Sequence, residues 1–122
     1  MNNKTVVIVG GGHAGVEAAL AVGNLGVSAI LVTMDRLATG RMSCNPAIGG
    51  LGKSQLVKEI DSLGGAMGGA ADFSGLQFKT LNKSKGRAVW SPRAQVDKIK
   101  YSHLISKHIY KNNNISVLCG EI

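Results

Sequence analysis

Apolar and polar positions near the start of the chain follow a strand, helix, strand pattern. Residues 4–9 are a continuous, largely β-branched run that ends at glycine, which predicts a strand buried on both faces of a parallel sheet. Residues 14–25, rich in Ala, Leu and Val, predict a helix that stops at Gly26, and residues 28–33 predict a second apolar strand. The order predicts a βαβ unit and the α/β class with a parallel sheet.

The middle of the chain predicts a loop followed by two helices. Residues 34–48 have no regular period and are expected to form a loop. Apolar residues recur at helical spacing through residues 49–63, so a helix is expected there, closed by the Gly64-Gly65 pair. The small, glycine-rich stretch 66–75 is expected to form a short helix.

The last third of the chain predicts a hairpin, a long helix and a strand. Apolar residues over 76–81 and again at 88–90 predict two short strands around an intervening turn. Ser91 followed by Pro92 is typical of a helix N-cap with proline at the first helical position, so a long amphipathic helix is expected from that point. Residues 115–119 are expected to form a last strand.

Length and composition limit the class of protein. The chain has 122 residues, 44% of them hydrophobic and 17% charged, which fits one globular domain at most. The first apolar run is cut at once by glycines, so neither a membrane span nor a signal peptide is expected. Cys44 and Cys119 lack the spacing of metal ligands, so no metal site is expected. A reducing, cytoplasmic setting is expected for a chain with so few cysteines.

The net charge of +7 comes from one segment. Residues 79–111 hold nine basic residues and one acidic residue, whereas residues 1–78 hold five of each. A basic segment favours phosphates, nucleic acid or anionic surfaces as partners.

A glycine-rich loop separates the first predicted strand from the first predicted helix. Gly10-Gly11-Gly12-His13-Ala14-Gly15 fits the pattern GxGxxG. In this context Gly10 permits a tight turn, Gly12 lets a pyrophosphate approach the backbone, and Gly15 lets the helix pack close to the sheet. The helix N-terminus adds free N–H groups and a partial positive charge. The loop therefore predicts a dinucleotide site.

The acidic residue that usually accompanies this loop is displaced. It is expected about 20 residues later, at the end of the second strand, where it holds a ribose hydroxyl. Thr33 occupies that place, and its hydroxyl can still bond a ribose oxygen; Asp35, two residues on, can supply the carboxylate. This departure from the motif counts against NAD as the bound dinucleotide more than it counts against FAD.

The loop after the second strand carries a cysteine. It contains the string Met-Ser-Cys-Asn-Pro-Ala-Ile-Gly-Gly, in which the cysteine is Cys44. In a doubly wound fold this loop leaves the carboxyl edge of the sheet, where ligands bind, so Cys44 can face the cofactor. A thiol just before a helix N-terminus and near Arg41 and Lys53 would have its thiolate favoured. A buried, inert cysteine is the alternative.

Five motifs together closely resemble one family. They are GGGHAG, MSCNPAIGG, LVKEIDSLGG, LNKSKG and RAQVD, and they resemble the MnmG (GidA) family of FAD-dependent tRNA uridine-modifying enzymes over essentially the whole chain. The resemblance implies a Rossmann-like FAD/NAD(P)-binding domain with a small β-hairpin insertion. Residues 1–122 are then expected to be its N-terminal part, with the remainder of the enzyme absent.

The resemblance also implies an activity. Members of the family act with the GTPase MnmE to add a carboxymethylaminomethyl group to carbon 5 of the wobble uridine of certain tRNAs. They use FAD, NADH as reductant and methylenetetrahydrofolate as one-carbon donor, with glycine or ammonium as nitrogen donor. A cytoplasmic homodimer with no membrane attachment is implied for the full-length protein, and this chain alone is expected to be inactive.

The same resemblance implies roles for individual residues. Residues Gly10 to Gly15 are expected to be the loop that holds the FAD pyrophosphate, and Ile122 the position whose backbone meets the adenine. Cys44 is expected to be catalytic, either as a nucleophile toward the uridine ring or as a proton donor.

Other candidates keep two interpretations. His13 either orders the glycine loop or transfers a proton. The basic side chains of the hairpin either contact tRNA phosphates or form a solvated face; they are Lys79, Lys83, Lys85, Arg87 and Arg93. Cys119 is expected in the core.

Two alternative functions stay open. One is that of a general FAD-dependent oxidoreductase of the two-dinucleotide-binding type, and the other is that of a small nucleotide-binding or structural module complete in itself.

Overall fold

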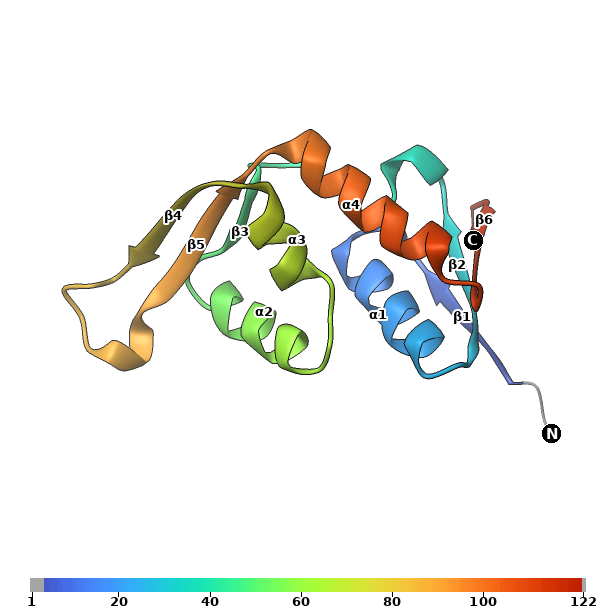
Figure 1. Ribbon diagram of the computed structural model, residues 1–122, viewed down its shortest axis with the longest axis horizontal. Helices are drawn as coiled ribbons and strands as arrows, with labels where there is room; N and C mark the ends of the chain where they lie inside the picture. The colour runs from blue at the N-terminus through green and yellow to red at the C-terminus, as the bar shows by residue number, and fades with distance from the viewer. Residues whose placement is uncertain (1–3, 122) are drawn as a thin grey trace. The chain divides into compact units, whose positions relative to one another are not determined.

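A parallel sheet and an antiparallel sheet organise the chain (Figure 1). The computed structural model describes residues 4–121. Their internal contacts divide them into a first unit, residues 4–41 with 102–121, and a second unit, residues 42–101.

The first unit is a three-stranded parallel sheet with the strand order β1-β2-β6. Its strands are β1 (Thr5–Val9), β2 (Ser28–Thr33) and β6 (Ile115–Cys119). Helix α1 (His13–Asn24) joins β1 to β2, and α4 (Lys98–Lys111) leads into β6. The predicted βαβ unit and the predicted last strand are confirmed. Because the strands are parallel, their carboxyl ends lie at one edge of the sheet.

The buried core of the first unit comes from α1, β2 and α4. Five apolar side chains are almost fully inaccessible to solvent: Val16 and Leu20 of α1, Leu31 of β2, and Ile105 and Ile109 of α4. These are the apolar positions of each element that face its neighbours, as an amphipathic pattern predicts.

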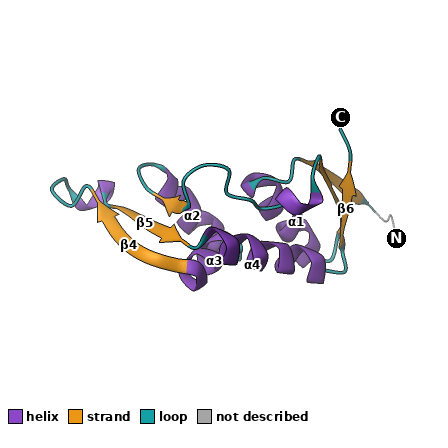
Figure 2. Ribbon diagram, turned by 90° about the horizontal axis from the view of Figure 1, so that it is seen from above, coloured by secondary structure: helices purple, strands orange, loops and turns teal. Residues whose placement is uncertain are grey.

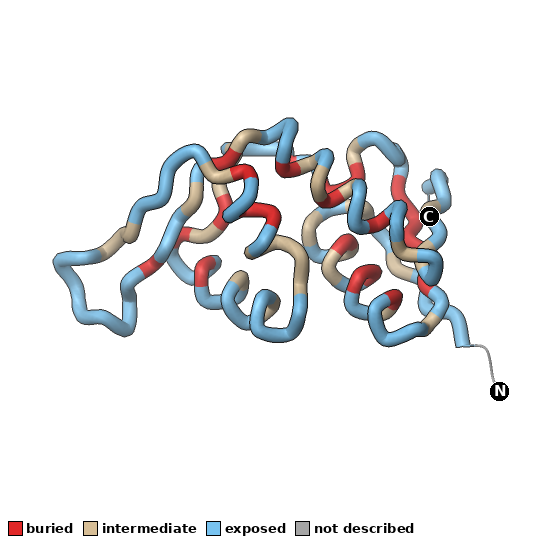
Figure 3. The backbone as a smooth tube through the Cα atoms, viewed as in Figure 1, coloured by how far each residue is buried: buried red, intermediate tan, exposed pale blue. Residues whose placement is uncertain are grey.

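Strand β1 is more exposed than its sequence predicts (Figure 3). Val7 is 58% exposed and Val9 is 65% exposed, so burial on both faces is wrong for the described residues. Within residues 4–121, β1 lies at the edge of the sheet and pairs with β2 alone. A β-branched run predicts the strand correctly but does not predict its position in the sheet.

The second unit is a three-stranded antiparallel sheet with the strand order β3-β5-β4. Figure 2 shows its two longer strands, β4 and β5, side by side. Its strands are β3 (Ala47–Gly49), β4 (Gly75–Leu81) and β5 (Ser91–Val96). Helices α2 (Lys53–Ser62) and α3 (Met67–Ser74) lie between β3 and β4 in the chain. Among the described residues, no helix is both long enough and apolar enough to cross a bilayer.

Residues 47–49, predicted to be loop, form strand β3. Ala47 lies opposite Gln95, and Ile48, opposite Ala94, is buried. Three residues are too few to show a period of two, so the pairing depends on the partner strand. Because these residues pair as a strand, α2 begins at Lys53 and not at Gly49.

The second strand of the hairpin and the start of α4 also differ from the prediction. Residues 87–89 form a short 3-10 turn (η2, Arg87–Val89), and the strand begins after it, at Ser91. Pro92 sits near the start of β5, where a missing backbone donor is tolerated. The true N-cap is Asp97, whose Oδ1 accepts hydrogen bonds from the backbone N–H groups of Ile99 (3.0 Å) and Lys100 (3.1 Å). The predicted helix start at Ser91-Pro92 is therefore wrong.

Candidate functional site

The loop between β1 and α1 turns at Gly10. Its φ angle is +104°, which side chains rarely tolerate, and its backbone N–H donates to the carbonyl of Val32 (2.8 Å). This bond ties the end of β1 to the end of β2. The chain then turns away from the sheet and enters α1.

Gly12 is the N-cap of α1 and faces open space. Its backbone is extended, its carbonyl accepts from the N–H of Val16 (3.0 Å), and a Cβ built on it meets no atom within 4 Å. The first N–H groups of a helix have no partner inside that helix, and they lie at its positive end. An anion can therefore approach the backbone at Gly12 without meeting a side chain.

Gly11 and Gly15 face protein instead of open space. A Cβ on Gly15 would overlap the carbonyl oxygen of Gly10, so the first turn of α1 packs directly on the end of β1. A Cβ on Gly11 would lie 2.6 Å from Thr33 Oγ1 and 3.0 Å from Thr33 Cβ. Both contacts require the absence of a side chain, and together they fix the loop against β1 and β2.

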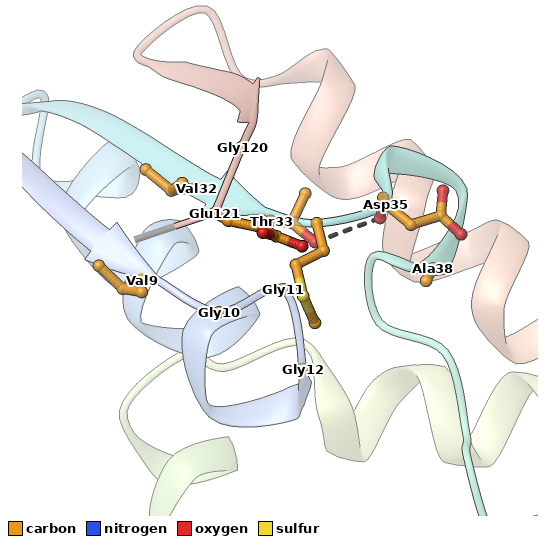
Figure 4. Close-up of a pocket in the computed structure, with 11 residues that line it drawn as sticks. Val9, Gly10, Gly11, Gly12, Val32, Thr33, Asp35, Ala38, Gly120 and Glu121 are labelled. Atoms are coloured by element: carbon orange, nitrogen blue, oxygen red, sulfur yellow. Dashed lines mark hydrogen bonds between the residues drawn. The ribbon is translucent and has the colours of Figure 1, made fainter.

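A hollow of about 600 Å³ opens where this loop meets the carboxyl ends of the three strands (Figure 4). Its volume is within the range of small-molecule and cofactor sites. Its lining, mostly backbone and apolar groups, is Val9, Gly10, Gly11, Gly12, Val32, Thr33, Met34, Asp35, Ala38, Gly120 and Glu121.

The structure brings five of the predicted site residues to this hollow: Gly10, Gly11, Gly12, Thr33 and Asp35. Gly15 contributes through its packing on Gly10, and His13 and Ala14 form the start of α1. Ile122 lies outside the described residues.

Thr33 and Asp35 are partly engaged with the protein. The Thr33 hydroxyl donates to the backbone carbonyl of Asp35 (3.2 Å), and Asp35 Oδ1 accepts from the N–H of Leu37 (2.8 Å), which caps the short 3-10 turn η1 (Arg36–Ala38). The Thr33 oxygen keeps an acceptor site, whereas the carboxylate of Asp35 also holds its own loop. Figure 4 shows this carboxylate directed away from the glycine loop.

Sequence reasoning missed Gly120 and Glu121 as lining residues. The N–H of Gly120 donates to the carbonyl of Thr33 (3.0 Å), which extends the pairing of β6 with β2 and leads the chain to the hollow. The signal was present, because residues directly after a parallel strand lie at the ligand-binding edge of the sheet. Glu121 thus brings a second carboxylate to the lining of the hollow, from the end of β6 and not from the end of β2, where the acid is expected.

His13 occupies the first position of α1. Partial burial lowers the pKa of His13 below its ordinary value, and the nearby charge of Glu17 acts in the opposite direction. The neutral imidazole is therefore favoured, which suits the positive end of a helix better than a cation does.

Cys44 is an exposed, free cysteine of the second unit. Strand β3 separates it from α2, which begins at Lys53, so the expected helix N-terminus does not follow the cysteine directly. Cys119 is also exposed, not buried as predicted, because β6 is an edge strand; its Sγ lies 3.1 Å from the carbonyl oxygen of Met34. In the described part of the chain, no group of three or more His, Cys, Asp or Glu side chains could hold a metal ion.

Comparisons with known proteins agree on one family. The family model described as "Glucose inhibited division protein A" matches residues 5–122. Two relatives carry the name "tRNA uridine 5-carboxymethylaminomethyl modification enzyme MnmG". The one from Chlorobaculum tepidum is 54% identical over 93% of this chain, and the one from Salinibacter ruber is 51% identical over 92%. The chain spans 17–18% of the length of these curated relatives.

Solved structures give the same fold. Aquifex aeolicus GidA matches with a TM-score of 0.86 and 49% identity, over 93% of this chain and 19% of that one. A p-nitrophenol 4-monooxygenase from Pseudomonas putida matches with a TM-score of 0.58 and 16% identity, over 95% of this chain and 32% of that one, which is a likeness of fold alone. The predicted Rossmann-like fold is confirmed.

The lowered pKa of His13 predicts a pH-dependent stability. The unfolded chain binds a proton at His13 near pH 6.5, whereas the folded chain binds it only at lower pH. The protein should therefore lose stability as the pH falls from 7.5 to 5.5, and His13→Gln should reduce that loss. Thermal unfolding of both proteins at the two pH values measures the effect. An equal loss in both proteins would contradict this assignment.

Proposed function

Because the chain belongs to the Glucose inhibited division protein A family, we propose that it supplies the FAD-binding part of a tRNA-modifying enzyme. The observation that carries the proposal is identity above 50%, over more than nine-tenths of the chain, with two enzymes named for this modification. The glycine loop and the hollow beside it give the proposal a physical basis.

The residues of the hollow fit a flavin dinucleotide. The open space at Gly12 and the N-terminal N–H groups of α1 suit its pyrophosphate. The Thr33 hydroxyl and the Glu121 carboxylate lie at the carboxyl ends of neighbouring strands, where such oxygens can bond a ribose. Asp35 also lines the hollow, and its carboxylate would have to turn away from the N–H of Leu37 to reach a ribose. When bound, FAD supplies the redox chemistry for the one-carbon transfer, and the protein positions the reactants and excludes water.

The proposed reaction adds a carboxymethylaminomethyl group to carbon 5 of the wobble uridine of tRNA. NADH is the proposed reductant and methylenetetrahydrofolate the one-carbon donor, with the MnmE GTPase as partner. We place the enzyme in the cytoplasm as a homodimer. In this scheme residues 4–121 contribute the phosphate-binding end of the FAD site.

Cys44 is the proposed catalytic residue. Its thiol is exposed and outside any disulfide, which a group that reacts with a bound uridine requires. It acts either as nucleophile toward the ring or as proton donor.

The variant Gly12→Ser should weaken FAD binding without destabilising the fold. Serine is a favoured N-cap, and the position has a negative φ and open space, so the flavin-free protein should unfold at an unchanged or higher temperature. The side chain would nevertheless occupy the space proposed for the pyrophosphate. FAD affinity, measured by flavin fluorescence titration of the complete protein, should fall about tenfold or more, which corresponds to about 1.4 kcal/mol.

A matched control is Gly86→Ser. Gly86 is also an N-cap glycine with negative φ and no atom near its Cβ position, but it lies in the hairpin. Its variant should bind FAD as the wild type does. Wild-type affinity in Gly12→Ser would contradict the pyrophosphate assignment.

The modification itself is tested by mass spectrometry of tRNA nucleosides from a strain that lacks the gene. The modified wobble uridine should disappear and should return with the wild-type gene or with Cys119→Ser, which changes the other exposed cysteine. Cys44→Ser should bind FAD but fail to restore the nucleoside, because it lacks the reactive thiol.

Two outcomes would count against the proposal. Restoration by Cys44→Ser would remove Cys44 from the chemistry. Unchanged tRNA in the deletion strain, with FAD bound to the purified protein, would favour the general oxidoreductase.

A further inference from the structure

The β4–β5 hairpin has two chemically different faces. Along β4, Phe78 belongs to the apolar face, opposite Ala94, and both line a cavity together with residues of α2 and α3. Lys79 and Gln77 belong to the other face, where they lie opposite Arg93 and Gln95. These four polar side chains of the second face are all exposed.

The cations on this polar face stand directly opposite each other. Lys79 is paired with Arg93 across the two strands, and like charges in such a pair repel. The hairpin itself, residues 75–96, contains no Asp or Glu. Asp61 and Asp72 line the cavity of α2 and α3 that Arg93 also borders, and they do not line the hollow on the polar face. A surface that concentrates two cations in this way is suited to an anion that lies across both.

A shallow hollow of about 240 Å³ lies on this face, and both Lys79 and Arg93 line it. It is lined by Gln77, Lys79, Leu81, Arg93 and Gln95, so amide groups flank the cationic pair. Amides can donate to phosphate and sugar oxygens or accept from a ribose hydroxyl, and guanidinium and ammonium groups bind phosphate.

The tip of the hairpin, residues 83–90, adds further cations, and hydrogen bonds hold its backbone. Trp90 Nε1 donates to the carbonyl of Lys85 (3.2 Å), and the guanidinium of Arg87 lies 5.6 Å from the centre of the Trp90 ring. The N–H of Lys85 donates to the carbonyl of Asn82 (2.9 Å). The tip, which also carries Lys83, is exposed along its length (Figure 3).

We infer that the polar face of this hairpin, with Lys79 and Arg93 at its centre, binds the sugar-phosphate backbone of the RNA substrate. The inference rests on the proposed function, which makes the substrate a tRNA. Five basic residues without an acidic one match a polyanion, and the flanking amides match the ribose and phosphate oxygens of RNA. The contact is independent of sequence and positions the tRNA without reading its bases.

The test compares two double variants that remove the same charge. Lys79→Gln with Arg93→Gln changes the hairpin face, whereas Lys100→Gln with Lys107→Gln removes two exposed lysines from α4. For each complete protein, unmodified tRNA is titrated at several salt concentrations. The hairpin variant should bind at least about tenfold more weakly, and the slope of log affinity against log salt should be shallower by about one to two.

Folding provides an internal check. Removal of the opposed charges relieves repulsion, so the hairpin variant should unfold at an unchanged or higher temperature and retain its FAD. The α4 variant should bind tRNA within about twofold of wild type.

The outcomes separate this inference from the proposed function. If the wild type binds tRNA and the hairpin variant binds equally well with the same salt slope, the inference is overturned and the function stands. If both double variants weaken binding equally, the contact is general electrostatic attraction and the inference is also overturned. If the wild type does not bind tRNA, the proposed function fails together with the inference.

Discussion

The first turn of α1 packs on the end of β1 because Gly15 has no side chain to hold it away from the carbonyl of Gly10. The rest of the candidate site depends on this contact. It brings the N-terminus of the helix to the edge of the sheet, where the N-cap of α1, Gly12, lines the same hollow as the strand ends. A larger residue at position 15 would displace the helix and with it the positive end of its dipole.

The parallel sheet brings the remaining groups to this edge. The backbone N–H of Gly10 donates to the carbonyl of Val32, and the N–H of Gly120 donates to the carbonyl of Thr33. These hydrogen bonds bring the residues that follow β1, β2 and β6 together. Thr33 then fixes the backbone of Asp35, and Asp35 caps the turn after it. The site is thus assembled mainly by the main chain, and its few polar side chains are held by local bonds.

The sequence predicted the strands and helices of the first unit well. In the second unit it predicted α2, α3 and β4 but missed β3 and misplaced β5, for physical reasons. Residues 5–9, 28–33 and 115–119 are runs whose composition alone favours strands, and the glycine spacing indicates how the helix packs. In the second unit, strand β3 depends on its partner β5, and Pro92 is compatible with a strand start as well as with a helix start. Asp97 and Ser91 are both good N-caps, and only the hydrogen bonds of Asp97 distinguish them. The exposure of Cys119 and β1 follows from strand order, which a local pattern does not contain.

The FAD site is tested most directly by a crystal structure of the complete protein with FAD bound. The pyrophosphate should lie over Gly10 to Gly12, within hydrogen-bond distance of the N–H groups that begin α1, with the ribose next to Thr33, Asp35 or Glu121. A pyrophosphate bound elsewhere, with the glycine loop free of ligand, would contradict this assignment.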